Sequence, residues 1–245
     1  MQRERPDRMP MIVTKDAAGA ARRAAMVMAN HIVGAHGARG RALVAVSGGA
    51  TPWVMLADLA SRTLPWGRVH VVQVDERVAP DGDPDRNLTH LYACLAGTGT
   101  TIHAMDVGSG DAERAAMAYA RELAELTSPT HRSQSVTTRM PVLDLVHLGL
   151  GEDGHTASLV PGDAVLDVRE TSVAATRPYN GHRRVTLTYP VLAAARRVLW
   201  LATGEAKAEM VARLVAGDPS IPAGSVRSDR ALLVVDEAAA HLLLR

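Results

Sequence analysis

Residues 148–158 read LGLGEDGHTAS, and an apolar run from Val142 to Leu148 leads into them. Four to eight apolar residues bounded by turn signals are typical of a buried strand, so the run predicts one. The glycines that follow allow positive φ angles and close approach of the backbone to a ligand. Open α/β sheets bind ligands at the carboxyl ends of their strands, which is where this pattern places His155. Because histidine titrates near neutral pH, the segment predicts acid–base chemistry.

Strand and helix patterns alternate along the rest of the chain. The expected strands are 42–46, 69–74, 142–148, about 171–176, 183–188, 197–202 and 231–235, and the expected helices are 16–37, 51–60, 88–95, 112–126, 190–195 and 204–216. This alternation predicts a mostly parallel sheet covered by helices. We expect one α/β domain over residues 11–245, after a flexible tail over residues 1–10. The polar stretch 127–141 is interpreted as a surface excursion, because strands continue beyond it.

The composition argues against several classes of protein. The 245 residues carry a net charge of +1, which gives no electrostatic basis for binding nucleic acid or an acidic membrane. The single cysteine, Cys94, can form neither an internal disulfide nor a cysteine-based zinc site. No apolar run is long enough to span a bilayer, and the charged start of the chain lacks the apolar segment of a secretory signal. We therefore expect a cytoplasmic protein, monomeric or weakly homo-oligomeric, with no nucleic-acid or membrane partner.

The loop Ser47-Gly48-Gly49 follows the predicted strand 42–46 and precedes a helix that opens at Thr51. Free backbone N–H groups and the positive end of the helix then lie beside the loop, which suits an anion such as phosphate. The spacing matches neither the P-loop nor the dinucleotide motif. A tight strand–helix turn without a ligand explains the loop equally well.

The triplet Asp75-Glu76-Arg77 ends the next predicted strand. Arg77 can bind a phosphate through two parallel hydrogen bonds. A surface ion pair between neighbouring residues is the alternative, and such pairs contribute little free energy. The position next to a strand that ends in a glycine loop favours phosphate binding.

Lys207 is one of only two lysines among the 27 basic residues, the other 25 being arginine. A lysine kept at one internal position indicates that a compact ammonium group is needed there, since the two cations are not interchangeable. The helix dipole disfavours a cation in the first turn of the predicted helix 204–216, and a bound anion would offset that cost. A solvated surface lysine is the alternative.

His155 differs from the other nine histidines in its surroundings. It alone lies in a glycine-framed loop with carboxylates beside it, whereas the others fall in helical patterns, in strands or at the edges of elements. No two histidines have the spacing of a metal site with a third ligand. The sequence therefore predicts no catalytic metal.

Five segments, taken together and in order, resemble the 6-phosphogluconolactonase family, whose superfamily includes sugar-phosphate deaminases and ribose-phosphate isomerases. They are residues 47–52, 75–77 with Asn87, 143–159, 184–188 and 204–208, and they extend over nearly the whole chain. The resemblance implies a three-layer α/β/α sandwich with a Rossmann-like sheet, and it implies no cofactor. It also implies hydrolysis of 6-phospho-D-glucono-1,5-lactone to 6-phosphogluconate, the second step of the oxidative pentose phosphate pathway.

Three positions depart from the family pattern. Arg86 precedes Asn87 where serine is common, Val160 stands where phenylalanine is common, and Glu152 stands where proline is frequent. The first two are interpreted as changes at the pocket edge or in packing. Glu152 adds a carboxylate that would stabilise a charged imidazole at His155 if the two groups were close.

The resemblance and the chemistry of lactone opening together assign expected roles. Water must lose a proton as it attacks, and the ring oxygen must gain one as it leaves. We therefore expect His155 to act first as general base and then as general acid, with Asp153 or Glu152 orienting it. Substrate and phosphate binding is expected from Ser47, Gly48, Gly49, Asp75, Arg77, Asn87, Arg184 and Lys207.

Two other functions are weighed against this one. Glucosamine-6-phosphate deaminases share the Asp-Gly-His segment, but they typically carry Asp-Glu-Tyr in place of residues 75–77 and a different sequence after the histidine. A non-catalytic sugar-phosphate sensor would need a DNA-binding appendage, for which the expected ten-residue tail is too short.

Overall fold

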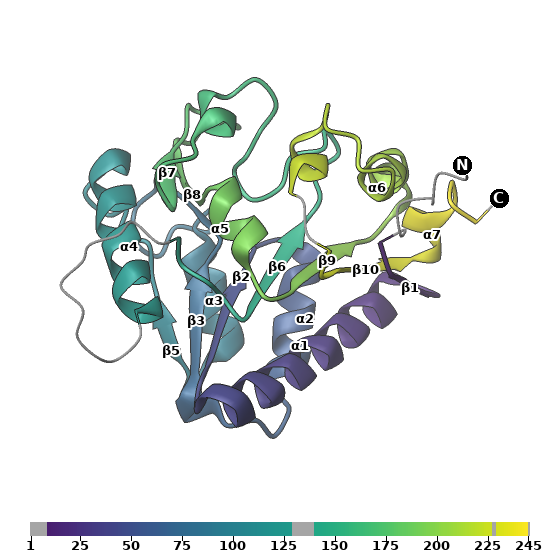
Figure 1. The fold of residues 1–245 in the computed structure, drawn as a ribbon, viewed down its shortest axis with the longest axis horizontal. Helices are drawn as coiled ribbons and strands as arrows, with labels where there is room; N and C mark the ends of the chain where they lie inside the picture. Colours follow the sequence, from purple (N-terminus) through teal and green to yellow (C-terminus); the bar gives the residue numbers. More distant parts are fainter. Residues whose placement is uncertain (1–8, 129–139, 227–228, 245) are drawn as a thin grey trace, which may run out of the picture.

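The computed structural model describes residues 9–128, 140–226 and 229–244, and its centre is a seven-stranded parallel sheet (Figure 1). The strands lie in the order β1-β10-β9-β6-β2-β3-β5, and every pair of neighbours is parallel. Their bounds are β1 (Met11–Thr14), β2 (Ala42–Val46), β3 (Val69–Gln73), β5 (Thr101–His103), β6 (Leu145–Gly149), β9 (Val198–Ala202) and β10 (Ala231–Asp236). The mostly parallel sheet expected from the sequence is confirmed.

Helices cover both faces of this sheet, which confirms the three-layer sandwich. One face packs against α1 (Ala17–Arg39), α2 (Ala50–Ala60) and α3 (Asn87–Leu95), and the other against α4 (Ala112–Thr127), α5 (Tyr189–Ala194), α6 (Ala208–Val215) and α7 (Glu237–Ala240). Successive side chains of a strand enter opposite cores: in β9, Leu199 faces α1 to α3, whereas Val198 and Trp200 face the other helices. Strands buried on both faces are apolar throughout, which explains the continuous runs in the sequence.

A second, smaller sheet is antiparallel and borders the carboxyl end of β3. It contains β4 (Asp75–Arg77), β8 (Arg184–Leu187) and β7 (Val173–Ala175) in that order, with α4 packed against β7 and β8. Residues 75–77 were expected at the end of the strand that starts at Val69, and this expectation was wrong, because they form a separate strand in the small sheet. The chain leaves the large sheet after Gln73, and residues 75–77 then pair with β8.

Some elements begin later than the sequence patterns indicated. β6 starts at Leu145, three residues after Val142. Just before it, the Asp144 carboxylate accepts the Leu43 N–H and forms an ion pair with Arg39. The helix expected from residue 204 begins with a 3-10 turn (Glu205–Lys207), and α6 follows from Ala208.

Three short elements, β1, β5 and α7, have only three or four residues each and were not predicted. A segment of this length carries too little periodicity to be recognised. Residues 1–8 and 129–139, which hold most of the expected tail and of the expected surface excursion, lie outside the described residues. Within the described ranges, no helix combines the length and apolar character needed to cross a membrane.

Candidate active site

A cavity of about 620 Å³ opens at the carboxyl ends of β2, β6 and β9 and is bordered by β4 and β8. Cavities of this size commonly bind small molecules. All of the residues proposed as site residues from the sequence line it, namely Ser47, Gly48, Gly49, Asp75, Arg77, Asn87, Glu152, Asp153, His155, Arg184 and Lys207. The fold therefore brings five distant segments of the chain to one place.

His155 lies in the loop after β6 and is paired with Asp153. Its Nδ1 atom is 2.5 Å from Oδ1 of Asp153. Because a carboxylate only accepts hydrogen bonds, Nδ1 is the donor, and in a neutral ring the lone pair then lies on Nε2. In the part of the chain that the structure describes, Nε2 makes no hydrogen bond, and the side chain is 26% exposed. The pair therefore leaves Nε2 of His155 without a protein partner among the described residues at the cavity.

The electrostatics of Asp153 favour its charged form. Partial burial opposes ionisation, but hydrogen bonds from His155 and Tyr179 outweigh it and hold the pKa of Asp153 below its ordinary value. A charged Asp153 in turn stabilises positive charge on the imidazole of His155.

Glycine at position 151 makes room for this pair. A Cβ atom there would lie 2.1 Å from Nδ1 of His155 and 2.6 Å from Oδ1 of Asp153. The Gly151 N–H also donates to the carbonyl of His155 at 2.8 Å, which closes the loop on itself. Close approach of the imidazole thus explains one of the glycines that mark this segment in the sequence.

Glu152 lines the cavity, but it is exposed, and no contact joins its carboxylate to His155. The sequence left open whether Glu152 or Asp153 orients the imidazole. Because the backbone of the loop turns between them, only the Asp153 carboxylate meets the ring.

The loop Ser47-Gly48-Gly49 joins β2 to α2 and is anchored on a buried histidine. The Ser47 hydroxyl donates to the carbonyl of His147 at 3.1 Å, and the Ser47 N–H donates to Nδ1 of the same residue at 3.4 Å. Complete burial lowers the pKa of His147 to about 3, so its ring stays neutral and can accept. The first N–H groups of a helix have no partner within it, and α2 directs this end towards the loop that lines the cavity.

Lys207 lines the same cavity as the residues at the start of α2. Its ammonium group donates to the carbonyl of Leu150 at 2.7 Å. The loop that precedes it is tied to α2 by a hydrogen bond of 2.8 Å between the hydroxyls of Thr51 and Thr203. An ammonium group has three donors, so Lys207 can hold its position and still bind an anion beside the helix end.

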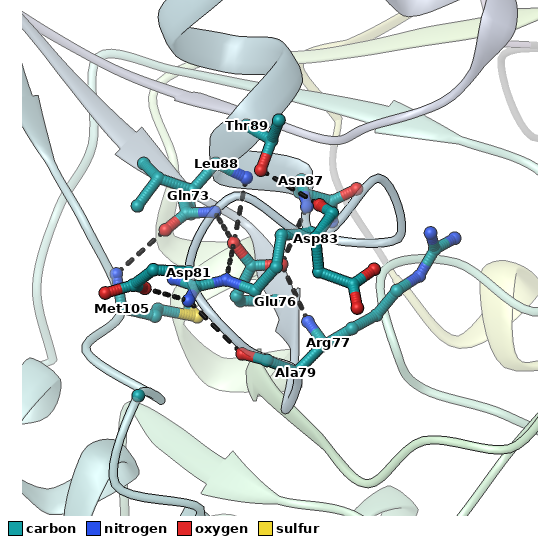
Figure 2. Close-up of polar contacts among 12 residues, drawn as sticks. Gln73, Glu76, Arg77, Ala79, Asp81, Asp83, Asn87, Leu88, Thr89 and Met105 are labelled. Carbon is teal, nitrogen blue, oxygen red and sulfur yellow. Dashed lines mark hydrogen bonds and ion pairs between the residues drawn. The ribbon is translucent and has the colours of Figure 1, made fainter.

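Glu76 joins the cavity-lining residues Arg77 and Asn87 through a network of hydrogen bonds (Figure 2). This carboxylate is fully buried and accepts the backbone N–H groups of Arg77, Asn87 and Leu88, each at 2.8 Å. It also accepts the side-chain amide of Gln73 at 2.8 Å. Two of these contacts satisfy the first N–H groups of α3, so Glu76 joins β4 to the start of that helix.

The side chain of Asn87 extends this wall towards the glycine loop. Its amide donates to the carbonyl of Asp75 at 3.0 Å. A Cβ atom on residue 48 would lie 2.1 Å from Oδ1 of Asn87, so Gly48 is required for this approach. Asn87 thus packs between β4 and the loop after β2.

Two guanidinium groups lie side by side in the small sheet. Arg77 and Arg184 are direct partners across β4 and β8, and the Nε atom of each is buried without a hydrogen-bond partner. The carboxylate of Asp75 accepts from the Ser158 hydroxyl at 2.6 Å, and burial raises the pKa of Asp75 despite that bond and the nearby charge of Arg184. Adjacent guanidinium groups with unused donors suit an anionic ligand.

Tyr179 is a cavity residue that the sequence analysis missed. Its hydroxyl donates to Oδ2 of Asp153 at 3.0 Å, and its ring lies edge-on to His155 with 5.5 Å between centroids. The guanidinium of Arg184 lies 5.1 Å from the centre of the same ring. A single tyrosine in a polar turn belongs to no motif, so no sequence signal pointed to it.

Across residues 9–128, 140–226 and 229–244, no set of three or more His, Cys, Asp or Glu side chains is placed to hold a metal ion. A pair of histidines does occur away from the cavity, where Nδ1 of His70 lies 3.0 Å from Nε2 of His103, and Nδ1 of His103 lies 2.6 Å from Glu122.

Comparisons with known proteins show the family and the fold. The model of the family described as "Glucosamine-6-phosphate isomerases/6-phosphogluconolactonase" matches residues 15–235. The 6-phosphogluconolactonase of Streptomyces coelicolor is 35% identical over 256 residues, covering 98% of this chain and 96% of the relative. That of Rattus norvegicus is 36% identical over 221 residues, covering 84% and 82%. The structure of 6-phosphogluconolactonase from Trypanosoma brucei superposes with a TM-score of 0.85 at 25% identity, covering 96% of this chain and 98% of that one.

Proposed function

This chain belongs to the family of glucosamine-6-phosphate isomerases and 6-phosphogluconolactonases, and we propose that it hydrolyses 6-phospho-D-glucono-1,5-lactone to 6-phospho-D-gluconate. Relatives that carry the name of this activity are about one-third identical over most of both chains. The observation that carries the chemistry is the orientation of His155, which offers Nε2 inside a cavity that also contains cationic side chains.

His155 moves the proton that lactone opening requires. Nε2 takes a proton from water as the water oxygen bonds to the carbonyl carbon. The tetrahedral intermediate then collapses, the bond from that carbon to the ring oxygen breaks, and the imidazolium returns its proton to the ring oxygen. The histidine is regenerated, and catalysis of this kind contributes about two to four orders of magnitude in rate.

Asp153 supports both halves of this cycle. Its hydrogen bond to Nδ1 fixes the tautomer in which Nε2 is the base. Its negative charge stabilises the imidazolium that exists between the two proton transfers. Glu152, which does not touch the imidazole, contributes only a more distant charge at the rim.

The phosphate of the substrate is held by groups away from His155. Lys207 and the N–H groups at the start of α2, with the loop of Ser47, Gly48 and Gly49, provide one set of donors. Arg77 and Arg184, which also line the cavity, supply further positive charge. Binding this remote group positions the lactone carbonyl for attack, so binding energy is converted into rate.

Asp75 and Asn87 complete the proposed substrate contacts from the wall between these two sets. We take the enzyme to act in the cytoplasm as a monomer or weak homo-oligomer, with a small phosphosugar lactone as its partner and no nucleic acid.

The proposal is tested by lactone hydrolysis measured against spontaneous opening in water. Phosphorylated and unphosphorylated gluconolactone are compared in a pH-stat, which records the acid released. We expect clear acceleration of the phosphorylated lactone and a much weaker effect on the other. No acceleration above background would overturn the proposal, and ammonia release from glucosamine 6-phosphate would assign the deaminase reaction instead.

A further inference from the structure

The carboxylate that orients His155 is itself held on its other side. Oδ1 of Asp153 meets both the ring Nδ1 of His155, at 2.5 Å, and the backbone N–H of the same residue, at 3.1 Å. Oδ2 accepts the hydroxyl of Tyr179 at 3.0 Å. The Asp153 side chain is 37% exposed, so Tyr179 occupies the oxygen that would otherwise face water.

Tyr179 comes from a rigid turn in the small sheet rather than from the loop of His155. It lies at the tip of the hairpin between β7 and β8, where its backbone N–H donates to the carbonyl of His182 at 2.9 Å. The two residues between them, Asn180 and Gly181, have φ angles of 50° and 83°. Positive φ at both central positions is typical of a two-residue turn that matches the twist of a hairpin, which fixes the approach of the strands.

Further contacts of His182 and of the Tyr179 ring hold the tip of this hairpin in place. Nε2 of His182 lies 3.1 Å from Oδ2 of Asp85, in the loop that follows β4. The aromatic ring of Tyr179 lies between the imidazole of His155 and the guanidinium of Arg184. These contacts leave the phenol hydroxyl directed at Asp153, so its position is determined by the small sheet.

We propose that Tyr179 is a positioning residue that acts through Asp153 and so sets both the orientation of His155 and the stability of its charged form. This inference rests on the proposed function, in which His155 transfers the proton. A phenol that donates to a carboxylate withdraws part of its negative charge. Tyr179 therefore moderates how strongly Asp153 stabilises the imidazolium while preventing the carboxylate from rotating away.

Other charged groups line the same cavity without touching the imidazole. They come from the loop of His155 itself, from β4, from β8 and from the turn after β9, and they are Glu152, Asp75, Arg77, Arg184 and Lys207. Within the described part of the chain, the side-chain hydrogen bond to the ring of His155 comes from Asp153 and its aromatic contact from Tyr179. A change confined to the Tyr179 hydroxyl thus reaches the histidine through Asp153.

The test is the pH profile of kcat/KM for Tyr179→Phe, which removes the hydroxyl and keeps the ring. We expect kcat/KM at neutral pH to fall about two- to tenfold, the effect of losing one ordinary hydrogen bond. The acid limb should move to higher pH by about half a unit, because the uncompensated carboxylate stabilises the imidazolium more. Tyr92→Phe, at a tyrosine that is 53% exposed on α3, is the matched control and should leave the profile unchanged.

A double-mutant cycle shows whether the hydroxyl acts through the carboxylate. In an Asp153→Ala background, Tyr179→Phe should cost no further activity, since the acceptor is gone. The inference would be overturned if the double variant lost activity by the product of the two single losses. It would also be overturned if the acid limb of Tyr179→Phe did not shift. The variant His155→Ala separates this outcome from failure of the proposed function. If His155→Ala is active, the proton-transfer role itself is contradicted. If His155→Ala is inactive and Tyr179→Phe behaves like the wild type, only the role of Tyr179 is contradicted.

Discussion

Replacing Gly151 by alanine should damage catalysis selectively, because the three atoms nearest to the new methyl group belong to His155 and Asp153, the proposed catalytic pair. The added Cβ would lie 2.1 Å from Nδ1 of His155, and real Cβ contacts are essentially never shorter than 3.0 Å. The imidazole must therefore retreat by about 0.9 Å, the difference between these two distances. The φ angle of Gly151 lies outside the left-handed region, so alanine imposes no backbone strain of that kind.

A displacement of about 1 Å at a reacting group can lower a rate about a hundredfold. We expect kcat of Gly151→Ala to fall by about that factor, while KM changes little because the proposed phosphate contacts lie elsewhere in the cavity. The assay is lactone hydrolysis corrected for spontaneous opening, with circular dichroism to show that the variant folds. Gly34→Ala, where an added Cβ meets nothing within 4 Å in α1, is the control for the substitution itself. A folded Gly151→Ala enzyme with kcat close to that of the wild type would refute the claim that this glycine makes room for the base.

Two further predictions concern the phosphate contacts and the support beneath them. Lys207→Ala should raise KM for the phosphorylated lactone about ten- to a hundredfold, the range for a charged hydrogen bond, and leave hydrolysis of the unphosphorylated lactone unchanged. The matched control is Lys15→Ala, at the exposed second lysine. Equal effects of Lys207→Ala on both lactones would contradict the phosphate role. His147 binds a proton below about pH 6.5 in the unfolded chain, but only near pH 3 when it is buried in the folded protein. Between these two pH values the unfolded state holds the extra proton. The free energy of unfolding therefore falls as pH decreases through this window, by up to about 1.4 kcal/mol per pH unit. Urea unfolding at pH 7 and pH 5 should show a smaller loss for His147→Asn than for the wild type, and identical losses would show that the buried ring is not the cause.

The five inner strands of the large sheet were predictable because they are buried on both faces, whereas the less buried edge strands β1 and β5 were not. Runs such as Ala42–Val46 and Val198–Ala202 are apolar throughout and end at glycine or polar residues, which fixes both their type and their carboxyl ends. Since those ends meet at one edge of a parallel sheet, the residues that follow them were expected to gather, and they line one cavity.

In the small sheet, β7 and β8 fall within strands expected from the sequence, but β4, which consists of three charged residues, was not recognised as a separate strand. Residues 75–77 follow β3 after a single residue, so the sequence shows no boundary between them. The burial of Glu76 depends on N–H groups from residues 87 and 88, which are distant in sequence. Periodicity cannot reveal a carboxylate that is satisfied by a distant helix end.

The choice between Glu152 and Asp153, and the presence of Tyr179, required the tertiary structure. Neighbouring carboxylates in a glycine-rich loop look equivalent in sequence, and the backbone path alone decides that Asp153 meets the imidazole. Tyr179 reaches the same carboxylate from a hairpin 26 residues further along the chain. Contacts between a loop and a hairpin of another sheet leave no local pattern.

The central claim, that His155 transfers the proton, is tested most directly by the turnover of His155→Ala on 6-phosphogluconolactone above the spontaneous rate. We predict that kcat falls by about two to four orders of magnitude, with the variant folded and substrate binding retained through the groups that hold the phosphate. A folded His155→Ala enzyme whose kcat stays within a few-fold of the wild type would contradict the account.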